Sequence, residues 1–200
     1  MRSVSTRCAF PVTVLATAFL LFGRITVNAA PYTLDSKAKN RVEFHSKATL
    51  ESFSGKAKGI TAVFDIDPTT LHSTKGRVTV DLRSLDTGID LRNKHMRENH
   101  LHTDSFPNAV FELDSVAGAG TSAIAPTIVT IHGAMTIHGT TRVVSAPATI
   151  TGLGSDAVRV QAEFPLKITE YGVPRPEFLF LKLAEEVRII VDLTLTPSAK

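Results

Sequence analysis

The amino-acid sequence predicts an all-β domain built from about eight antiparallel strands. Three observations support this prediction. Apolar side chains recur at every second position through much of the chain, most clearly from Val187 to Leu195. β-Branched residues are abundant in these stretches, which favours strands over helices. Turn-forming residues separate the stretches, as at Asp67–Pro68, Gly118–Pro126, Gly152–Gly154 and Gly172–Pro176.

Each predicted strand carries one apolar face. In chain order, the alternating apolar residues are Val42 and Phe44; Ala62, Phe64 and Ile66; Val78, Val80 and Leu82; Phe111 and Leu113; Val129, Ile131, Met135 and Ile137; Val144, Ala146, Ala148 and Ile150; Val158, Val160, Ala162 and Phe164; and Val187 to Leu195. Strands with one apolar face are typical of antiparallel sheets, and this number of them predicts a sandwich or a closed barrel. A membrane-spanning barrel is disfavoured because the strands carry charges on their second face and the chain has no tryptophan.

One segment departs from the strand pattern. Residues 90–102 show no period-two alternation, and Leu91, Glu98 and Leu101 follow at helical spacing. The spacing predicts a single helix of about three turns, with Asp90 as its N-cap.

Two short stretches, Thr130–Gly133 and Thr136–Gly139, have the same sequence, Thr-Ile-His-Gly. The two stretches begin six residues apart, which is too short a period for a repeat fold. We expect one long strand with glycine kinks or bulges, which places His132 and His138 on its polar face.

Residues 1–29 have the composition of a secretory signal peptide. Arg2 and Arg7 form a positively charged start, and an apolar run from Cys8 to Phe22 follows it. Val27-Asn28-Ala29 provides a cleavage site after Ala29. The run is too short for a comfortable membrane span, so an uncleaved anchor helix is the less favoured alternative. We therefore expect export to the periplasm or the exterior, with residues 30–200 forming one domain.

The charge balance argues against a nucleic-acid-binding protein. The net charge of +3 depends on Arg2, Arg7 and Arg24, and without them 19 basic side chains face 19 acidic ones. A protein that binds the phosphate backbone needs a basic surface on its folded domain. Cys8 is the only cysteine, which excludes a disulfide framework and a cysteine-ligated zinc site.

Three stretches of this chain resemble the YceI family of lipocalin-like, polyisoprenoid-binding periplasmic proteins. The first is Arg92 to Phe111, which is similar to the family's Arg-[Asp/Asn]-x-His-[Leu/Met] opening followed by Phe-Pro. The second is Gly133 to Gly139, and the third is Tyr171-Gly172 followed by Glu186-Val187 and the last alternating strand. The resemblance covers the whole of residues 30–200, and it rests on the order and spacing of these three stretches.

The resemblance implies an eight-stranded antiparallel lipocalin-like barrel with a long apolar cavity. The implied ligand is a polyisoprenoid or similar long-chain lipid, held for carriage or storage without a cofactor. An eight-stranded barrel is just wide enough for one small ligand. The alternation predicts a lining drawn from Phe44, Phe64, Val80, Phe111, Leu113, Ile131, Met135, Ile137, Val160, Phe164, Ile189, Val191 and Leu193. From the residues alone, a barrel filled by its own side chains stays an equal alternative.

The predicted helix gathers polar residues near its start. Arg92, His95 and Arg97 are candidates for binding a lipid head group, because arginine suits phosphate through paired hydrogen bonds. His95, Glu98 and His100 do not share one helix face, so we expect no metal site.

No motif in the sequence indicates a catalytic nucleophile with its base, so we expect a binding protein. Two rival functions remain: a barrel enzyme, such as an isomerase or cyclase, acting on a lipophilic substrate, or a stress or partner-binding module with a filled core. The lysines and arginines from Lys37 to Lys58 are interpreted as a solvated face, and contact with an anionic membrane surface during ligand transfer is the less favoured alternative. The sequence leaves homodimer formation open.

Overall fold

The computed structural model describes residues 30–48, 52–67, 70–118, 125–154, 156–175, 177–178 and 181–198. The predicted signal peptide lies outside these residues. The strands are β1 (Ala30–Leu34), β2 (Arg41–Ala48), β3 (Ser52–Lys56), β4 (Gly59–Ile66), β5 (Lys75–Asp81), β6 (Asn108–Ala117), β7 (Thr127–Ile137), β8 (Thr140–Gly152), β9 (Val158–Lys167), β10 (Glu177–Phe178) and β11 (Leu181–Pro197). The helical segments are η1 (Leu71–Ser73), η2 (Leu82–Ser84), α1 (Asp90–His95), η3 (Met96–His100) and η4 (Ile168–Tyr171).

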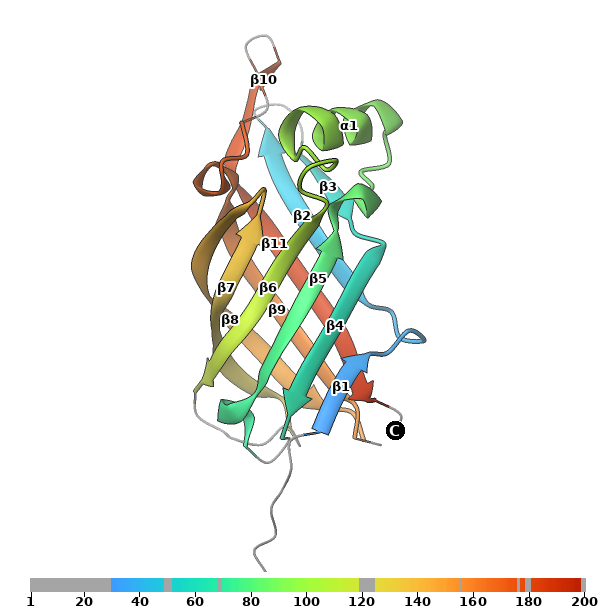
Figure 1. The fold of residues 1–200 in the computed structure, drawn as a ribbon, viewed down its shortest axis with the longest axis vertical. Helices are drawn as coiled ribbons and strands as arrows, with labels where there is room; N and C mark the ends of the chain where they lie inside the picture. Colours follow the sequence, from blue (N-terminus) through green and yellow to red (C-terminus); the bar gives the residue numbers. More distant parts are fainter. Residues whose placement is uncertain are drawn as a thin grey trace, which may run out of the picture.

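The strands form a closed antiparallel barrel with eight positions around its wall (Figure 1). The order is β1, β4, β5, β6, β7, β8, β9 and β11, and β11 returns to β1 through the pair Leu195 and Leu34. The 17-residue β11 also pairs with β2, so β1 and β2 share one position along it. β3 pairs with β2, and β4 pairs with β1, so β3 and β4 share the neighbouring position around the wall. The predicted closed barrel of eight antiparallel strands is confirmed.

Strand register places one face of each strand inside the barrel. Ile189 of β11 lies between Phe44 of β2 and Phe164 of β9, all apolar. On the opposite face of the same strand, Arg188 donates to Glu163 at 3.1 Å. The period-two pattern therefore separates an apolar interior from a charged exterior, as an antiparallel barrel requires.

The predicted helix is confirmed, but its first turn differs from the prediction. Ile89 is the N-cap, without a side-chain hydrogen bond, and Asp90 is the first helical residue. The capping role predicted for Asp90 is therefore wrong. The preceding turn explains the shift, because the Asp86 carboxylate accepts the Gly88 amide at 2.9 Å and fixes the approach to Ile89. The helix widens in η3, where the Leu101 amide donates to the Met96 carbonyl at 2.9 Å, and it ends at His100.

The second Thr-Ile-His-Gly stretch is not part of one long strand, which corrects that prediction. β7 ends at Ile137, and His138 and Gly139 form a two-residue turn with φ values of 51° and 73°. A hairpin turn of this type needs positive φ at both central positions. The first stretch does lie within a strand, and Gly133 faces a bulge in β6 between Leu113 and Ser115.

Helix α1 and η3 lie across one end of the barrel, next to β10 and the ends of β2 and β3 (Figure 1). In the part of the chain that the structure describes, no helix has the length and apolar character needed to cross a bilayer.

Candidate ligand-binding cavity

The barrel encloses a cavity of about 1130 Å³. This volume exceeds the roughly 300–1,000 Å³ usual for small-molecule sites. All thirteen residues of the predicted lining contribute to the lining of this cavity. The interior is therefore not filled by its own side chains, and a filled-core module does not fit this structure.

The cavity is open at the helix end and closed at the other. Ile89 and Leu91 line the cavity and are 49% and 64% exposed. At the far end, Leu71 and Leu195 also line it but are only 2% and 1% exposed. We call the helix end, defined by Ile89, Leu91, Arg92 and His95, the mouth.

The lining includes residues beyond the thirteen predicted. Val78, Val187 and Leu195 belong to the predicted apolar faces but were not included in the predicted lining. Phe53 and Tyr171 could not be found this way, because short β3 lacks an alternating pattern and Tyr171 belongs to the turn η4.

Arg92 is held at the mouth by a neighbouring turn and an aromatic ring. Its Nε donates to Thr87 Oγ1 and its Nη2 donates to the Thr87 carbonyl oxygen, both at 2.9 Å. The guanidinium carbon lies 4.4 Å from the centroid of the Phe53 ring, in a cation–π contact. Phe53 in turn meets Phe44 edge to face, with 5.9 Å between ring centroids. The charge of Arg92 is thus fixed beside the cavity entrance.

The other polar candidates differ in their positions. His95 lines the cavity, whereas Arg97 lies outside the lining, with its Nη1 3.5 Å from the Arg83 carbonyl oxygen. His100, which was not predicted as a head-group ligand, also lines the cavity and its Nδ1 lies 3.2 Å from the Pro174 carbonyl oxygen. Burial lowers the pKa of His100. The structure therefore brings Arg92, His95 and His100 to the mouth.

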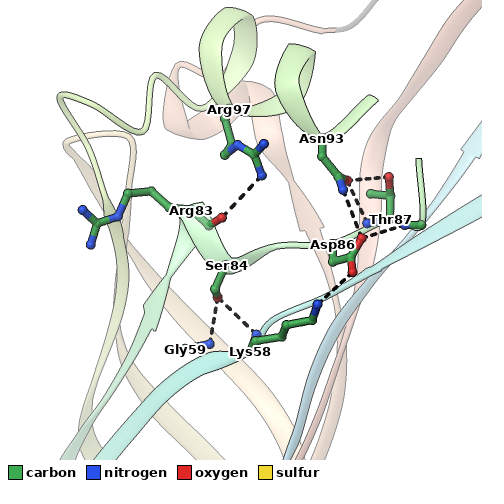
Figure 2. A network of polar contacts seen from close by, with 9 residues as sticks. Lys58, Gly59, Arg83, Ser84, Asp86, Thr87, Asn93 and Arg97 are labelled. Atoms are coloured by element: carbon green, nitrogen blue, oxygen red, sulfur yellow. Dashed lines mark hydrogen bonds and ion pairs between the residues drawn. The ribbon is translucent and has the colours of Figure 1, made fainter. Parts of the chain in front are cut away.

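A polar network attaches the helix to the barrel wall (Figure 2). Asn93 is 6% exposed, and its Oδ1 accepts from the amide and hydroxyl of Thr87 at 2.8 and 2.7 Å. Its Nδ2 donates to Asp86 Oδ1 at 3.0 Å. The Gly88 amide, Lys58 and Asn93 together hold the pKa of Asp86 well below its usual range. Asn93, which follows Arg92 in the family-like opening, therefore has a structural role: its side-chain amide holds the turn before the helix in place.

We expect Asn93→Ala to loosen this attachment. The substitution leaves Thr87 and Asp86 without their buried partner, which costs about 1–3 kcal/mol. Hydrogen exchange should show faster exchange at residues 87–93 while the strand ladders stay protected. Asn99→Ala, at an exposed position on the same helical segment, is the matched control and should leave exchange unchanged. Equal exchange in both variants would contradict the role given to Asn93.

The Asp86 contacts should make the turn sensitive to acid. The folded-state pKa is lowered, and the unfolded-state value is about 3.9. The contribution of Asp86 to stability is therefore complete above that value and is lost as the pH falls towards the folded-state pKa. Protection of the Gly88 amide should fall in the wild type below about pH 4. Asp86→Asn should remove this step, and a step of the same size in that variant would count against the assignment.

No group of three or more His, Asp, Glu or Cys side chains is arranged to hold a metal ion among the residues described. His102 instead lies with its Nδ1 2.8 Å from His138 Nε2, joining the segment after the helix to the β7–β8 turn. The ring of Phe106 packs against His138 with 4.6 Å between centroids.

A closed antiparallel barrel of eight positions, with an apolar interior and a helix over its open end, defines a lipocalin-like class of fold. The chain belongs to the YceI family, because the family model for the YceI-like domain matches residues 32–195. The family resemblance identified in the sequence is therefore confirmed.

Relatives and solved structures agree with this assignment. Protein YceI of Salmonella newport (strain SL254) is 28% identical over 164 residues, covering 78% of this chain and 83% of that protein. A UPF0312 protein of Vibrio vulnificus (strain YJ016), VVA0736, is 29% identical over 148 residues, covering 72% of this chain and 76% of its own length.

Two solved structures show the same fold. Burkholderia cenocepacia BcnA superposes with a TM-score of 0.70 and 24% identity, covering 80% of this chain and 98% of that one. A polyisoprenoid binding domain from Saccharophagus degradans, implicated in plant cell wall breakdown, has a TM-score of 0.67 and 18% identity, covering 86% and 99%.

Proposed function

We propose that this protein binds one long-chain lipid, a polyisoprenoid or similar molecule, inside the barrel, and that it acts as a binding protein without catalysis. The observation that carries the proposal is the cavity of about 1130 Å³ with its predominantly apolar lining. The similarity to a polyisoprenoid binding domain from Saccharophagus degradans supports the choice of ligand.

Apolar burial alone supplies enough binding free energy. Each CH₂ group transferred from water into an apolar site contributes roughly 0.8 kcal/mol. A long hydrocarbon chain in this cavity therefore needs few polar contacts for tight binding. Arg92, His95 and His100 at the mouth are placed to meet the polar end of such a lipid, whereas Arg97 lies outside the lining.

Export and carriage form the second part of the proposal. The signal-like residues 1–29 support delivery to the periplasm or the exterior, and N-terminal sequencing of the native protein should find Ala30 first. Ile89 and Leu91 support loading at a membrane surface, because these exposed side chains also line the cavity and give a lipid an apolar path inwards.

Native mass spectrometry of protein purified without detergent tests the binding proposal. We expect a population with added mass, and an organic extract should identify the lipid. The same spectrum reports whether the protein is a monomer or the homodimer left open by the sequence. A protein that is empty after purification and takes up no isoprenoid or fatty lipid on incubation would refute the proposal.

A further inference from the structure

Three inward-facing phenylalanine rings each lie over a glycine of the neighbouring strand. The pairs are Phe44 with Gly55 on β2 and β3, Phe64 with Gly76 on β4 and β5, and Phe111 with Gly133 on β6 and β7. In the first two pairs, the phenylalanine and the glycine are direct cross-strand partners. The arrangement therefore recurs in three separate strand pairs around the wall.

Each ring occupies the space that a side chain at the glycine would need. A Cβ added at any of the three glycines would lie less than 3.0 Å from a carbon of the ring. At Gly55 and Gly76, the three nearest atoms all belong to the phenylalanine ring, whereas Gly133 also faces the Glu112 carbonyl oxygen. The rings thus lie against the backbone of the next strand.

At Gly55 and Gly76 the backbone does not itself demand glycine. The glycines with positive φ among the described residues are Gly88, Gly118, Gly139, Gly154 and Gly172, and Gly55, Gly76 and Gly133 are not among them. Glycine within a strand is unfavourable because it loses more backbone entropy on folding than other residues and has no side chain to pack. Close approach of the ring is the remaining reason for glycine at Gly55 and Gly76.

The flat rings determine how much of the barrel stays open. Phe44, Phe64 and Phe111 all line the cavity and are only half-buried, as expected for rings that show one face to an open interior. A ring displaced from its glycine has the strand wall behind it, so it must turn towards the barrel axis. The width of the cavity therefore depends on having glycine, which has no side chain, opposite each ring.

We propose that Gly55 and Gly76 are specificity-determining residues that set the bore of the cavity for wide, methyl-branched chains such as isoprenoids. This inference rests on the proposed function. A methyl branch widens the chain at regular intervals, so a local constriction opposes a branched chain more than a straight polymethylene chain. Straight-chain fatty lipids pass through a narrower bore.

Gly55→Ala is the direct test, with binding of isoprenoid alcohols and straight-chain fatty acids of matched length measured by displacement of a fluorescent fatty acid. Loss of about two buried methylene groups weakens binding about tenfold, and we expect this loss for the isoprenoids. The fatty acids should change by less than about twofold. Gly55→Ala/Phe44→Leu should restore isoprenoid binding, because the smaller side chain removes the obstruction.

Gly76→Ala with Phe64→Leu repeats the test at an independent pair. Thermal unfolding of each variant establishes that it is folded, and if the alanine variants do not fold, Phe44→Leu alone should favour isoprenoids further over fatty acids. Folded alanine variants with unchanged selectivity, or an equal loss for both lipid classes without rescue, would overturn the inference while leaving the proposed function intact. Absence of lipid binding by the wild type would instead refute the proposed function and this inference with it.

Discussion

Val160→Asp is expected to abolish lipid retention. Val160 lies on β9 between Leu193 and Ile150 and lines the cavity. A carboxylate there either loses its hydration on ligand binding or draws water into the bore, and both cost several kcal/mol. We expect at least about a hundredfold weaker lipid binding, measured as lipid per protein after purification and by displacement of a fluorescent fatty acid.

Val143→Asp is the matched control for this prediction. Val143 is 87% exposed on β8, so the same substitution there should leave both folding and lipid binding unchanged. Phe111→Asp should have the effect of Val160→Asp, because its ring also lines the cavity. A folded double variant of Val160 and Phe111 that retains its full complement of lipid would show that the ligand does not occupy this interior.

Leu195→Ala is expected to have the largest effect on stability. Leu195 is 1% exposed, and it pairs with Leu34 of β1 on one side and Val158 of β9 on the other. Truncating a leucine at such a site costs about 2–5 kcal/mol, because the neighbouring strands cannot close the space that it leaves. The midpoint of urea unfolding should fall accordingly, with an unchanged slope if the denatured state is unaffected.

Leu153→Ala provides the comparison for Leu195→Ala. Leu153 is 50% exposed near the end of β8, and its truncation should change the free energy of unfolding by no more than about 0.5 kcal/mol. Similar losses for the two variants would mean that the closure between β1 and β11 contributes little to stability.

The inner face of the barrel was predictable from the sequence because side-chain orientation in a strand has a period of two. The phase of Val187, Ile189 and Val191 fixes which side chains point inwards, whatever the neighbouring strands are. The same reasoning placed Phe64 and Phe164 correctly on the inner face. Closure into a barrel with a cavity, by contrast, entered through the family resemblance, because alternation alone equally permits a sandwich.

The parts that sequence reasoning missed depend on contacts between distant segments. Asn93 has no pattern around it that reveals its bonds to Asp86 and Thr87. The turn at His138 was missed although it reverses the phase of the alternation: the inward-facing residues are odd-numbered up to Ile137 and even-numbered from Val144. The pairing of Phe44 with Gly55 appears only when the strand register is known.

The backbone pairing that closes the barrel through β1, β4 to β9 and β11 has a consequence for how a ligand can enter. Separating two of these paired strands would break several backbone hydrogen bonds at once, whereas among the described residues the end under α1 is lined by side chains such as Ile89, Leu91 and Arg92. A long molecule should therefore thread lengthwise, tail leading, until the tail reaches the closed end near Leu71. Its polar end enters last and should lie beside Arg92. The closed barrel therefore predicts the orientation of the bound lipid.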